Sequence, residues 1–520
     1  MIRSEADPRL WRPAISPFAR LTQCKGWGPM ASVPAVPAVS VFSLFLFLSA
    51  CMVGPNYKRP NVTAPAAFRG SPGAAQQSSF ADLPWWEVFK DETLKELIKT
   101  SLANNYDLAV AVARVEQARQ IAAEARSQYF PAIGYASVIS YGHNQFVGSP
   151  VSPSPNAQGF LLAIGRATWE ADLWGRIRRI NESARAQYLA TEEARRGVML
   201  SLASDVSQSY FELLGLRLQL DIAKETTQSY TATLKLFTDR LQEGLGNALQ
   251  TSRATADLAT AASSVQELER EIALKENQIS VLLGRNPDRI ETKLKLLEET
   301  VPPTVPAGLP SALLERRPDV LAAAEAVRSA NAQIGVAKAA YFPAIGLTTF
   351  FGKLSTPLAD LSSGNTNAWS LAANVSGPIF QGGGIRARNR QAVAYWQQTR
   401  AQYLQTALSA FRDVSDALIS RERYDAVRTD LIRAVQASEQ AVGLARMRYV
   451  EGLSSYNEIL EAQQRLYPAQ LALAQTEISR RLVIVQLYRA LGGGWNLTDA
   501  QWLTATPPPG APTPPPSPHK

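Results

Sequence analysis

The chain has 520 residues, a net charge of +8 and 19% charged residues, which are ordinary values for a folded protein. No long Lys/Arg run is present, so we expect no nucleic-acid partner. The sequence contains only two His (His143, His519) and two Cys (Cys24, Cys51). This supply is too small for a His/Cys metal site and nearly excludes a Ser-His-Asp triad. We expect neither an enzyme nor a bound metal or other non-covalent cofactor.

The first distinctive segment ends at Cys51. VSVFSLFLFLSAC contains an apolar run of about ten residues, whereas a bilayer-spanning helix needs roughly 20. The run is typical of a secretory signal, and Leu48–Cys51 resembles the lipobox of bacterial lipoproteins. We therefore expect residues 1–50 to be a signal peptide and Cys51 to carry the only cofactor, a covalent lipid. A free buried Cys or a short uncut anchor is the alternative. Met52, in place of Asp, favours the outer membrane.

The phrase YFPAIG occurs twice, at Tyr129–Gly134 and Tyr341–Gly346, 212 residues apart. Further along, EGL recurs at Glu243 and Glu451 with a shift of 208. Matches this far apart, with one small indel between them, indicate two copies of a unit of about 200 residues, much longer than a solenoid repeat.

Each copy of YFPAIG follows a helical stretch rich in Ala, Glu and Arg. Proline lacks the backbone N–H and disfavours helix in the residue before it, so the phrase predicts a switch from helix to strand. Two long strands are expected after each copy, with aromatic residues near their ends as in the girdles of membrane β-barrels. A hairpin of a soluble β-sandwich is the alternative. The predicted strands are 131–147, 160–174, 344–354 and 368–380, and the aromatic residues are Trp169, Trp174, Trp369 and Phe380.

A long proline-free stretch follows each strand pair. Each stretch would reach roughly 100 Å as one helix. A return helix is expected after each, and the first return helix repeats apolar residues every seven positions, which favours a coiled coil. The predicted long helices are 176–241 and 385–450, the return helices are 248–283 and 456–491, and the heptad residues are Leu258, Val265, Ile272 and Ile279.

These patterns divide the chain into five parts. After the signal peptide we expect an acylated, extended N-terminal segment over 51–90, a first repeat over 91–297, a second repeat over 298–494, and a Pro-rich disordered tail over 495–520.

The number of strands bears on the oligomeric state. Single-chain membrane barrels have at least eight strands, and open sheet edges in lipid leave backbone groups unpaired. Four strands per chain therefore require several chains to share one barrel, eight strands from two copies or twelve from three. The residues themselves do not choose between these numbers.

The combination of motifs resembles the TolC-like outer-membrane factors, and among them the NodT-type lipoproteins. The resemblance runs from Cys51 to about Gly494, with CMVGPNYKRP, LPSALLERRPDVLAAAEAVRSANAQIGVAKAAYFPAIG, SGPIFQGGGIRA and RYVEGLSSYNEILEAQQRLY in order. It implies a mainly α fold, trimeric, with a 12-stranded membrane β-barrel above a coiled-coil α-helical tunnel. It also implies a lipid-anchored position in the outer membrane with the helices in the periplasm, and two partners, a periplasmic adaptor and an inner-membrane pump.

The resemblance also assigns a periplasmic gate. The family's acidic positions, six and nine residues after the tip glycine, correspond to Glu458 and Glu461. Three chains would bring up to six carboxylates into one ring, which favours cations. The matching residues of the first repeat, Gln250 and Arg253, are not acidic. The alternative is that both Glu residues are solvated surface charges.

Gly244-Leu245 and Gly452-Leu453 mark the two hairpin tips. Locally, a left-handed glycine ends a helix and the following Leu covers the turn. The resemblance adds a second role for these tips, docking to the adaptor.

The function we expect is that of a passive duct for small molecules such as drugs and toxic compounds, energised elsewhere because no GxxxxGK[ST] loop is present. Three alternatives remain: a coiled-coil lipoprotein that braces the envelope without conducting, a duct for protein secretion, and the adaptor itself. The two matched strand pairs argue against the brace, and the second hairpin argues against the adaptor. The residues do not identify the cargo.

Overall fold

The structure is a computed structural model that describes residues 52–71, 79–88, 90–142, 158–298, 306–355 and 366–504. All of them belong to one compact unit, Cys51–Lys520. The predicted signal peptide, Cys51 and the tail from residue 505 lie outside the described residues.

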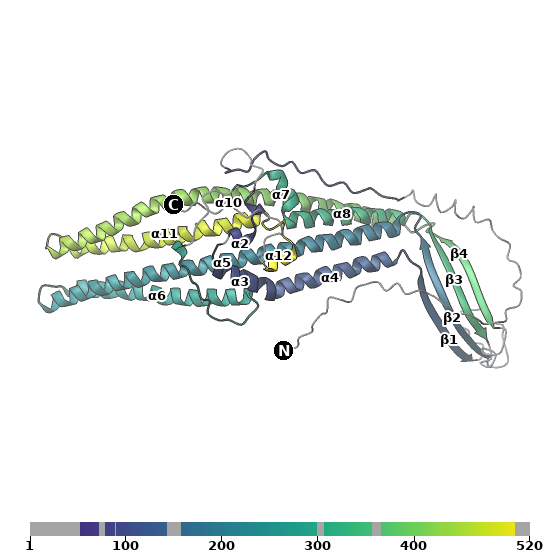
Figure 1. Ribbon diagram of the computed structural model, residues 1–520, viewed down its shortest axis with the longest axis horizontal. Coiled ribbons are helices and arrows are strands. Elements are labelled where there is room, and N and C mark those ends of the chain that lie inside the picture. The colour runs from purple at the N-terminus through teal and green to yellow at the C-terminus, as the bar shows by residue number, and fades with distance from the viewer. Residues whose placement is uncertain are drawn as a thin grey trace. The chain divides into compact units, whose positions relative to one another are not determined.

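The same order of elements occurs twice along the chain (Figure 1). Two helices lead into two strands, and the strands lead into a long helix and a return helix. The first set is α3 (Glu92–Asn104), α4 (Tyr106–Ser127), β1 (Ala132–Gly142), β2 (Gln158–Ala171), α5 (Arg176–Gln242) and α6 (Ala248–Leu282); the second is α7 (Pro310–Arg316), α8 (Pro318–Ala339), β3 (Ala344–Ser355), β4 (Asn367–Ser376), α10 (Gly384–Val450) and α11 (Tyr456–Ala490).

The long helical hairpins are equal in the two copies. α5 and α10 each have 67 residues, and α6 and α11 each have 35. Every boundary lies within one residue of its prediction because glycine marks each turn. α6 packs against α5 and α11 against α10, while α11 also contacts α5 and so joins the hairpins. No helix in the described part of the chain has the length and apolarity that crossing a membrane requires.

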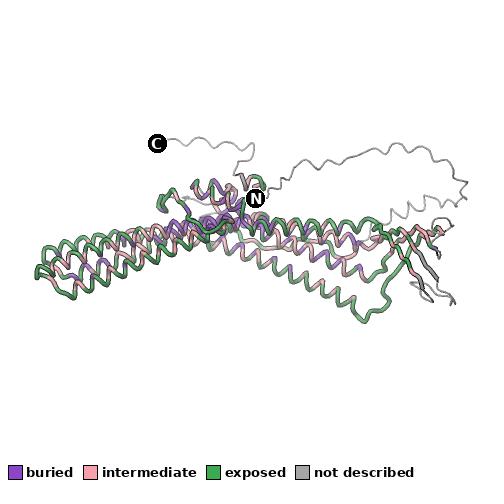
Figure 2. Tube along the Cα trace, turned by 90° about the horizontal axis from the view of Figure 1, so that it is seen from below, coloured by how far each residue is buried: buried purple, intermediate pink, exposed green. Residues whose placement is uncertain are grey.

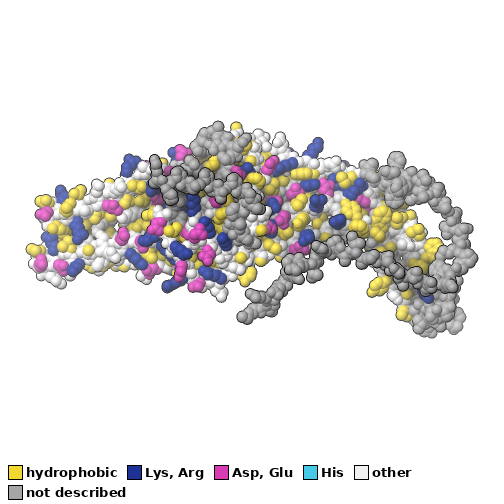
Figure 3. Space-filling model, in the orientation of Figure 1, with side chains coloured by type: hydrophobic (Ala, Val, Ile, Leu, Met, Phe, Trp, Pro, Cys, Tyr) yellow, Lys and Arg dark blue, Asp and Glu magenta, His cyan; other side chains and the backbone are white. Residues whose placement is uncertain are grey.

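The strands form one antiparallel sheet in the order β1-β2-β3-β4. The central pair joins the two copies, with Leu161 opposite Ser355 at one end and Ala171 opposite Ile345 at the other. Hydrophobic side chains are dense over this sheet, whereas charged side chains are spread over the helices (Figure 3). The mainly helical fold with four strands per chain agrees with the fold class expected from the sequence.

Two strands end earlier than predicted. β2 ends at Ala171 because the carboxylate of Asp172 turns back to accept hydrogen bonds from the N–H groups of Ile177 and Arg178, both at 3.0 Å, which caps α5. β4 ends at Ser376 because Gly377 and then Pro378 follow, and proline has no N–H for the ladder. The predicted residues 143–147 of the first strand lie outside the described residues.

The YFPAIG phrases form the switch that the sequence predicted. The N–H of Tyr129 bonds the carbonyl of Arg126 at 3.1 Å, a tight last turn, and β1 begins just after the proline. At each switch a tryptophan side chain holds the backbone by a hydrogen bond. The indole N–H of Trp169 donates to Tyr129 O at 3.0 Å, and that of Trp174 donates to Pro343 O at 2.8 Å. Trp169 and Trp174 therefore fix the helix-to-strand junctions, whereas Trp369 and Phe380 are widely exposed.

The main core lies midway along the helices, where buried residues concentrate (Figure 2). Trp85, Tyr210, Tyr403 and Tyr488 are all at most 1% exposed. Trp85 lies in α2 (Trp85–Val88), which follows η1 (Phe80–Asp82). The segment 51–90 is therefore not extended throughout, since its second part folds into the core.

The predicted disordered tail also begins with a folded part. Residues Asp499–Thr504 form α12, and Trp502 is only 5% exposed. Asp499 accepts hydrogen bonds from Arg195 at 2.9 Å. The sequence prediction was wrong up to Thr504, because burial of an indole ring offsets the cost of ordering a short segment.

Residues 52–71, here called the strap, cross helices of both copies. The guanidinium of Arg179, 1% exposed, donates to Gly54 O at 3.3 Å and to Asn56 Oδ1 at 2.9 Å. From the other copy, Asn331 Nδ2 donates to Pro55 O at 2.9 Å. A Cβ at Gly54 would lie 2.6 Å from the Cα of Gly335, so the backbones meet too closely for any other residue. The strap therefore clamps the two copies together.

Candidate functional site

The two hairpin tips have the same backbone geometry. Gly244 and Gly452 have φ of 74° and 71°, and the next N–H closes the helix at Arg240 O (2.9 Å) and Arg448 O (2.8 Å). This is the glycine cap expected from the sequence. Leu245 and Leu453 do not cover the turn, since both are 70% exposed. The tips thus present a leucine each to the surroundings.

Glu458 and Glu461 lie in the first two turns of α11, next to the second tip. Glu458 pairs with Arg448 across the turn at 3.3 Å, and Glu461 pairs with Arg465 one helical turn further on at 2.6 Å. All four side chains are about half exposed or more. The sequence analysis placed the carboxylates together but did not predict these arginines, which lower the net negative charge of the tip.

The first repeat has a different polar surface at the same place. Gln250 and Arg253 occupy the matching positions on α6, and Arg253 Nη1 donates to Asn457 Oδ1 on α11 at 3.5 Å. The structure therefore brings the non-acidic positions of the first tip next to the acidic residues of the second.

An aromatic cluster links the hairpins just behind the tips, and the sequence analysis missed it. Phe237 of α5 packs edge-on against Tyr456 at a centroid distance of 4.4 Å and against Tyr449 at 5.7 Å. The guanidinium of Arg240 lies 4.9 Å from the Tyr449 ring centroid. The clue in the sequence was the position of Tyr449 and Tyr456 on either side of the tip glycine. These rings hold the second hairpin against the first.

A buried polar group extends this cluster. Burial raises the pKa of Tyr456 to about 12, with the carboxylate of Asp257 nearby as the second cause. Burial likewise raises the pKa of Asp257. Further from the tip, Gln463 Nε2 of α11 donates to Ser229 Oγ of α5 at 3.2 Å. Between the hairpins, polar side chains therefore interact through the hydrogen bond of Gln463 and through the electrostatic effect of Asp257 on Tyr456.

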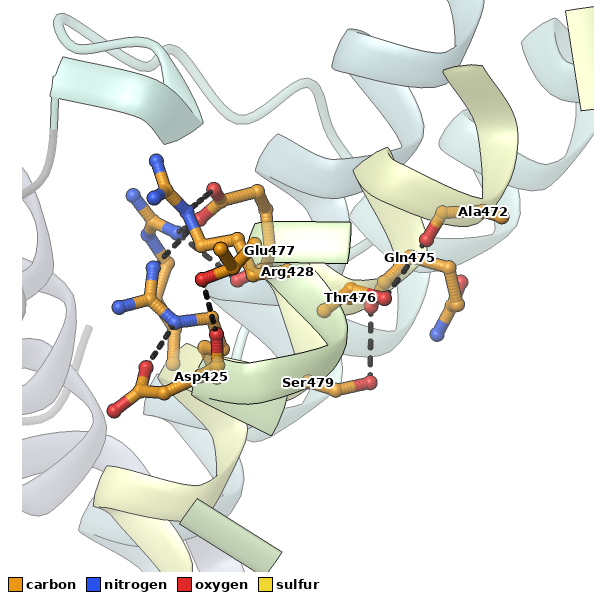
Figure 4. A network of polar contacts seen from close by, with 10 residues as sticks. Asp425, Arg428, Ala472, Gln475, Thr476, Glu477 and Ser479 are labelled. Atoms are coloured by element: carbon orange, nitrogen blue, oxygen red, sulfur yellow. Dashed lines mark hydrogen bonds and ion pairs between the residues drawn. The ribbon is translucent and has the colours of Figure 1, made fainter. Parts of the chain in front are cut away.

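A second polar network joins α10 to α11 (Figure 4). Glu477 is 4% exposed and accepts hydrogen bonds from Arg428, from Arg481 at 2.8 Å and from Arg480 at 3.1 Å. Arg480 also pairs with Asp425 at 2.7 Å. Burial favours the neutral acid, but the hydrogen bonds from Arg428 and Arg481 outweigh it and hold the pKa of Glu477 below its usual value. This network fixes the second hairpin internally.

The tips offer no evident metal site. No group of three or more His, Cys, Asp or Glu residues lies close enough to hold an ion within the described ranges. The arrangement suits a mechanical role instead: exposed leucines for contact, surface ion pairs that exchange easily, and aromatic packing between hairpins.

A duplicated chain with two long helical hairpins and a shared four-stranded sheet defines the class of outer-membrane channels with a helical extension. The chain belongs to the outer membrane efflux protein family, whose description matches it twice, over residues 97–285 and 309–493. Each match falls within one of the two repeats expected from the sequence, 91–297 and 298–494. This is a family of outer-membrane efflux channels and not of enzymes.

Individual relatives agree with this assignment. The chain is 32% identical over 456 residues to the "Probable efflux pump outer membrane protein TtgC" of Pseudomonas putida, covering 86% of this chain and 93% of the relative. It is 31% identical over 457 residues to the "Cation efflux system protein CusC" of Escherichia coli, covering 88% of this chain and 98% of the relative. The solved outer-membrane channel OprN matches with a TM-score of 0.80 and 32% identity, covering 86% of this chain and 100% of the OprN chain. The protein is an outer-membrane component of an efflux system.

Proposed function

We propose that three copies of this chain form one passive duct, with twelve strands closing a barrel in the outer membrane and the hairpins forming a tunnel below it. The observation that carries the proposal is the sheet itself. Its edge strands β1 and β4 have partners on one side only among the described residues. Apolar side chains on them are widely exposed: Ile133, Tyr135 and Ile139 on β1, and Trp369, Leu371 and Val375 on β4. Strands of neighbouring copies would pair with the open edges, and lipid would cover the exposed apolar side chains.

The duct catalyses no reaction and takes up what an inner-membrane pump delivers through a periplasmic adaptor. The names of the relatives specify efflux of toluene, solvents, antibiotics or cations. We propose small toxic molecules as the cargo of this chain as well. A covalent lipid on Cys51 adds an anchor in the outer membrane, because each buried CH₂ contributes about 0.8 kcal/mol.

The hairpin tips form the gate and the docking surface in this proposal. The exposed Leu245 and Leu453 contact the adaptor. The ion pair between Glu458 and Arg448 holds the second tip in its closed arrangement, and three copies place the acidic residues around one constriction. Rearrangement of surface ion pairs costs little, typically at most about 1 kcal/mol each, so binding of an adaptor suffices to shift them.

Electrical recording tests the duct. The purified protein, added to one side of a planar bilayer, should give discrete single-channel steps. The matched control is the same protein after heating above its unfolding midpoint. Absence of steps from native protein, with insertion verified by protection of the strands from protease, would contradict conduction and favour an envelope brace.

A further inference from the structure

A basic pocket lies between α4, α5 and α8, next to the ends of the strands. It has a volume of about 790 Å³ and reaches Tyr129, the residue at the helix-to-strand switch. Five arginines and one acidic residue are among the residues that line it: Arg119 and Arg126 from α4, Arg178, Glu182 and Arg185 from α5, and Arg328 from α8.

The positive charge of this pocket is only partly compensated. Glu182 is engaged by Arg179 at 2.7 Å, outside the set of pocket arginines. Three of the pocket arginines form ion pairs: Arg178 with Asp172 at 3.2 Å, Arg119 with Glu116 at 3.5 Å and Arg328 with Glu325 at 3.8 Å. Arg126 and Arg185 form no ion pair with any residue that the structure describes, and both are exposed. Two guanidinium groups from neighbouring helices therefore face one open pocket with their charge available.

The pocket lies on the side of the helices that carries the strap. The guanidinium of Arg328 lies 5.9 Å from the ring centroid of Tyr57 in the strap. The strap begins at the turn before α5, where the N–H of Val53 donates to Trp174 O at 3.0 Å. Cys51, the predicted lipid site, is two residues before Val53. The pocket and the start of the strap therefore lie near the same end of α5, where β2 leads into the helix.

We propose that this pocket binds the phosphate of an anionic phospholipid from the membrane leaflet in which the lipid anchor lies. The inference rests on the proposed function, which places the strands in the outer membrane. Guanidinium groups bind phosphate through paired N–H donors, and basic residues close to a membrane surface attract anionic headgroups. Basic residues near a lipid anchor add an electrostatic attachment to anionic lipids. The bound headgroup fixes the depth of the helix-to-strand switch at Tyr129.

The test is a titration of the full-length, acylated protein in detergent with three probes: dihexanoyl phosphatidylglycerol, dihexanoyl phosphatidylcholine and inorganic phosphate. The proposal predicts that the anionic lipid binds most tightly. Arg126→Gln/Arg185→Gln should weaken its binding about thirty-fold, from about 1 kcal/mol for each cation. The matched control is Arg386→Gln/Arg390→Gln, which removes two exposed arginines from the first turns of α10, outside the pocket. It should leave the affinity unchanged within about threefold.

Three results would overturn the proposal. Equal binding of the two lipids would show that charge is not recognised. Binding of inorganic phosphate as tight as that of the anionic lipid would assign the pocket to a soluble anion. An equal loss in the control would show that only overall charge matters. The pocket lies within one chain, so the titration is informative whether or not the chains form a trimer. Failure of the duct would instead appear as an absent conductance in protein that still binds the lipid.

Discussion

The two helical hairpins share one backbone plan, but they differ at the corresponding residues Glu269 and Glu477, which are 208 positions apart. Glu269 on α6 is 45% exposed and pairs with Lys224 at 3.2 Å. The side chain of Glu477 on α11 is 5% exposed and is surrounded by three arginines. The difference shows that the two copies share a backbone geometry, whereas the charged residues at matching positions are exposed in one copy and buried in the other. The second hairpin has a buried ionic lock and an acidic tip, and the first has neither at the matching positions.

The largest effect is expected from breaking the buried network. Glu477→Gln leaves Arg428 and Arg481 beside an uncharged group, which should destabilise the α10–α11 hairpin by about 3 kcal/mol. Glu269→Gln, the matched change in the first hairpin, should cost at most about 0.5 kcal/mol because its pair is exposed. Thermal unfolding in detergent and hydrogen exchange of α11 measure both. Equal effects of the two substitutions would contradict the difference between the hairpins.

The second-largest effect is expected in the pH dependence of stability. The folded state lowers the pKa of Glu477 from 4.5, so its ionised form stabilises the fold above that pH. This stabilisation should disappear as the pH falls below 4.5 towards the folded-state pKa. The midpoint of unfolding, followed from pH 7 to pH 3, should therefore drop more steeply in the wild type than in Glu477→Gln. Parallel curves would show that the network is not ionised as the contacts indicate.

A smaller effect is expected at the tips. Glu458→Gln removes the ion pair with Arg448, and in our proposal the closed arrangement becomes less stable by up to about 1 kcal/mol. The open probability in planar bilayers should rise by no more than about fivefold. Arg448→Gln should act in the same way, and the double variant should add nothing further. The matched change in the first hairpin, Gln250→Ala, should have no effect, and a rise equal to that of Glu458→Gln would argue against an acidic gate confined to the second tip.

The smallest effect on stability is expected from the exposed leucines. Leu245→Ser and Leu453→Ser should change the free energy of unfolding by less than about 0.5 kcal/mol, since neither side chain is buried. Drug efflux by cells that supply the pump and adaptor should nevertheless fall in both variants. Normal efflux with both leucines replaced would exclude them as the docking contacts.

The sequence predicted the helix boundaries well because single residues mark them. Gly244 and Gly452 close the hairpins, and the prolines of YFPAIG open the strands. The strand ends were less predictable, because Asp172 acts as a cap for α5 only once the turn has formed. Contacts between distant segments escaped prediction: the Phe237 cluster and the burial of Trp502 depend on the packing of segments far apart in the sequence. The arginine partners of Glu458 and Glu461 are local instead, ten and four residues away, and the helical spacing of Glu461 and Arg465 was a signal in the sequence for one of them.

The central claim is that one chain provides a third of a closed barrel. The most direct measurement is the native mass of the detergent-extracted, acylated protein, determined with the detergent contribution subtracted. The account predicts a species of three chains that remains intact on dilution. A stable monomer would contradict it, because four strands with open edges cannot enclose a pore.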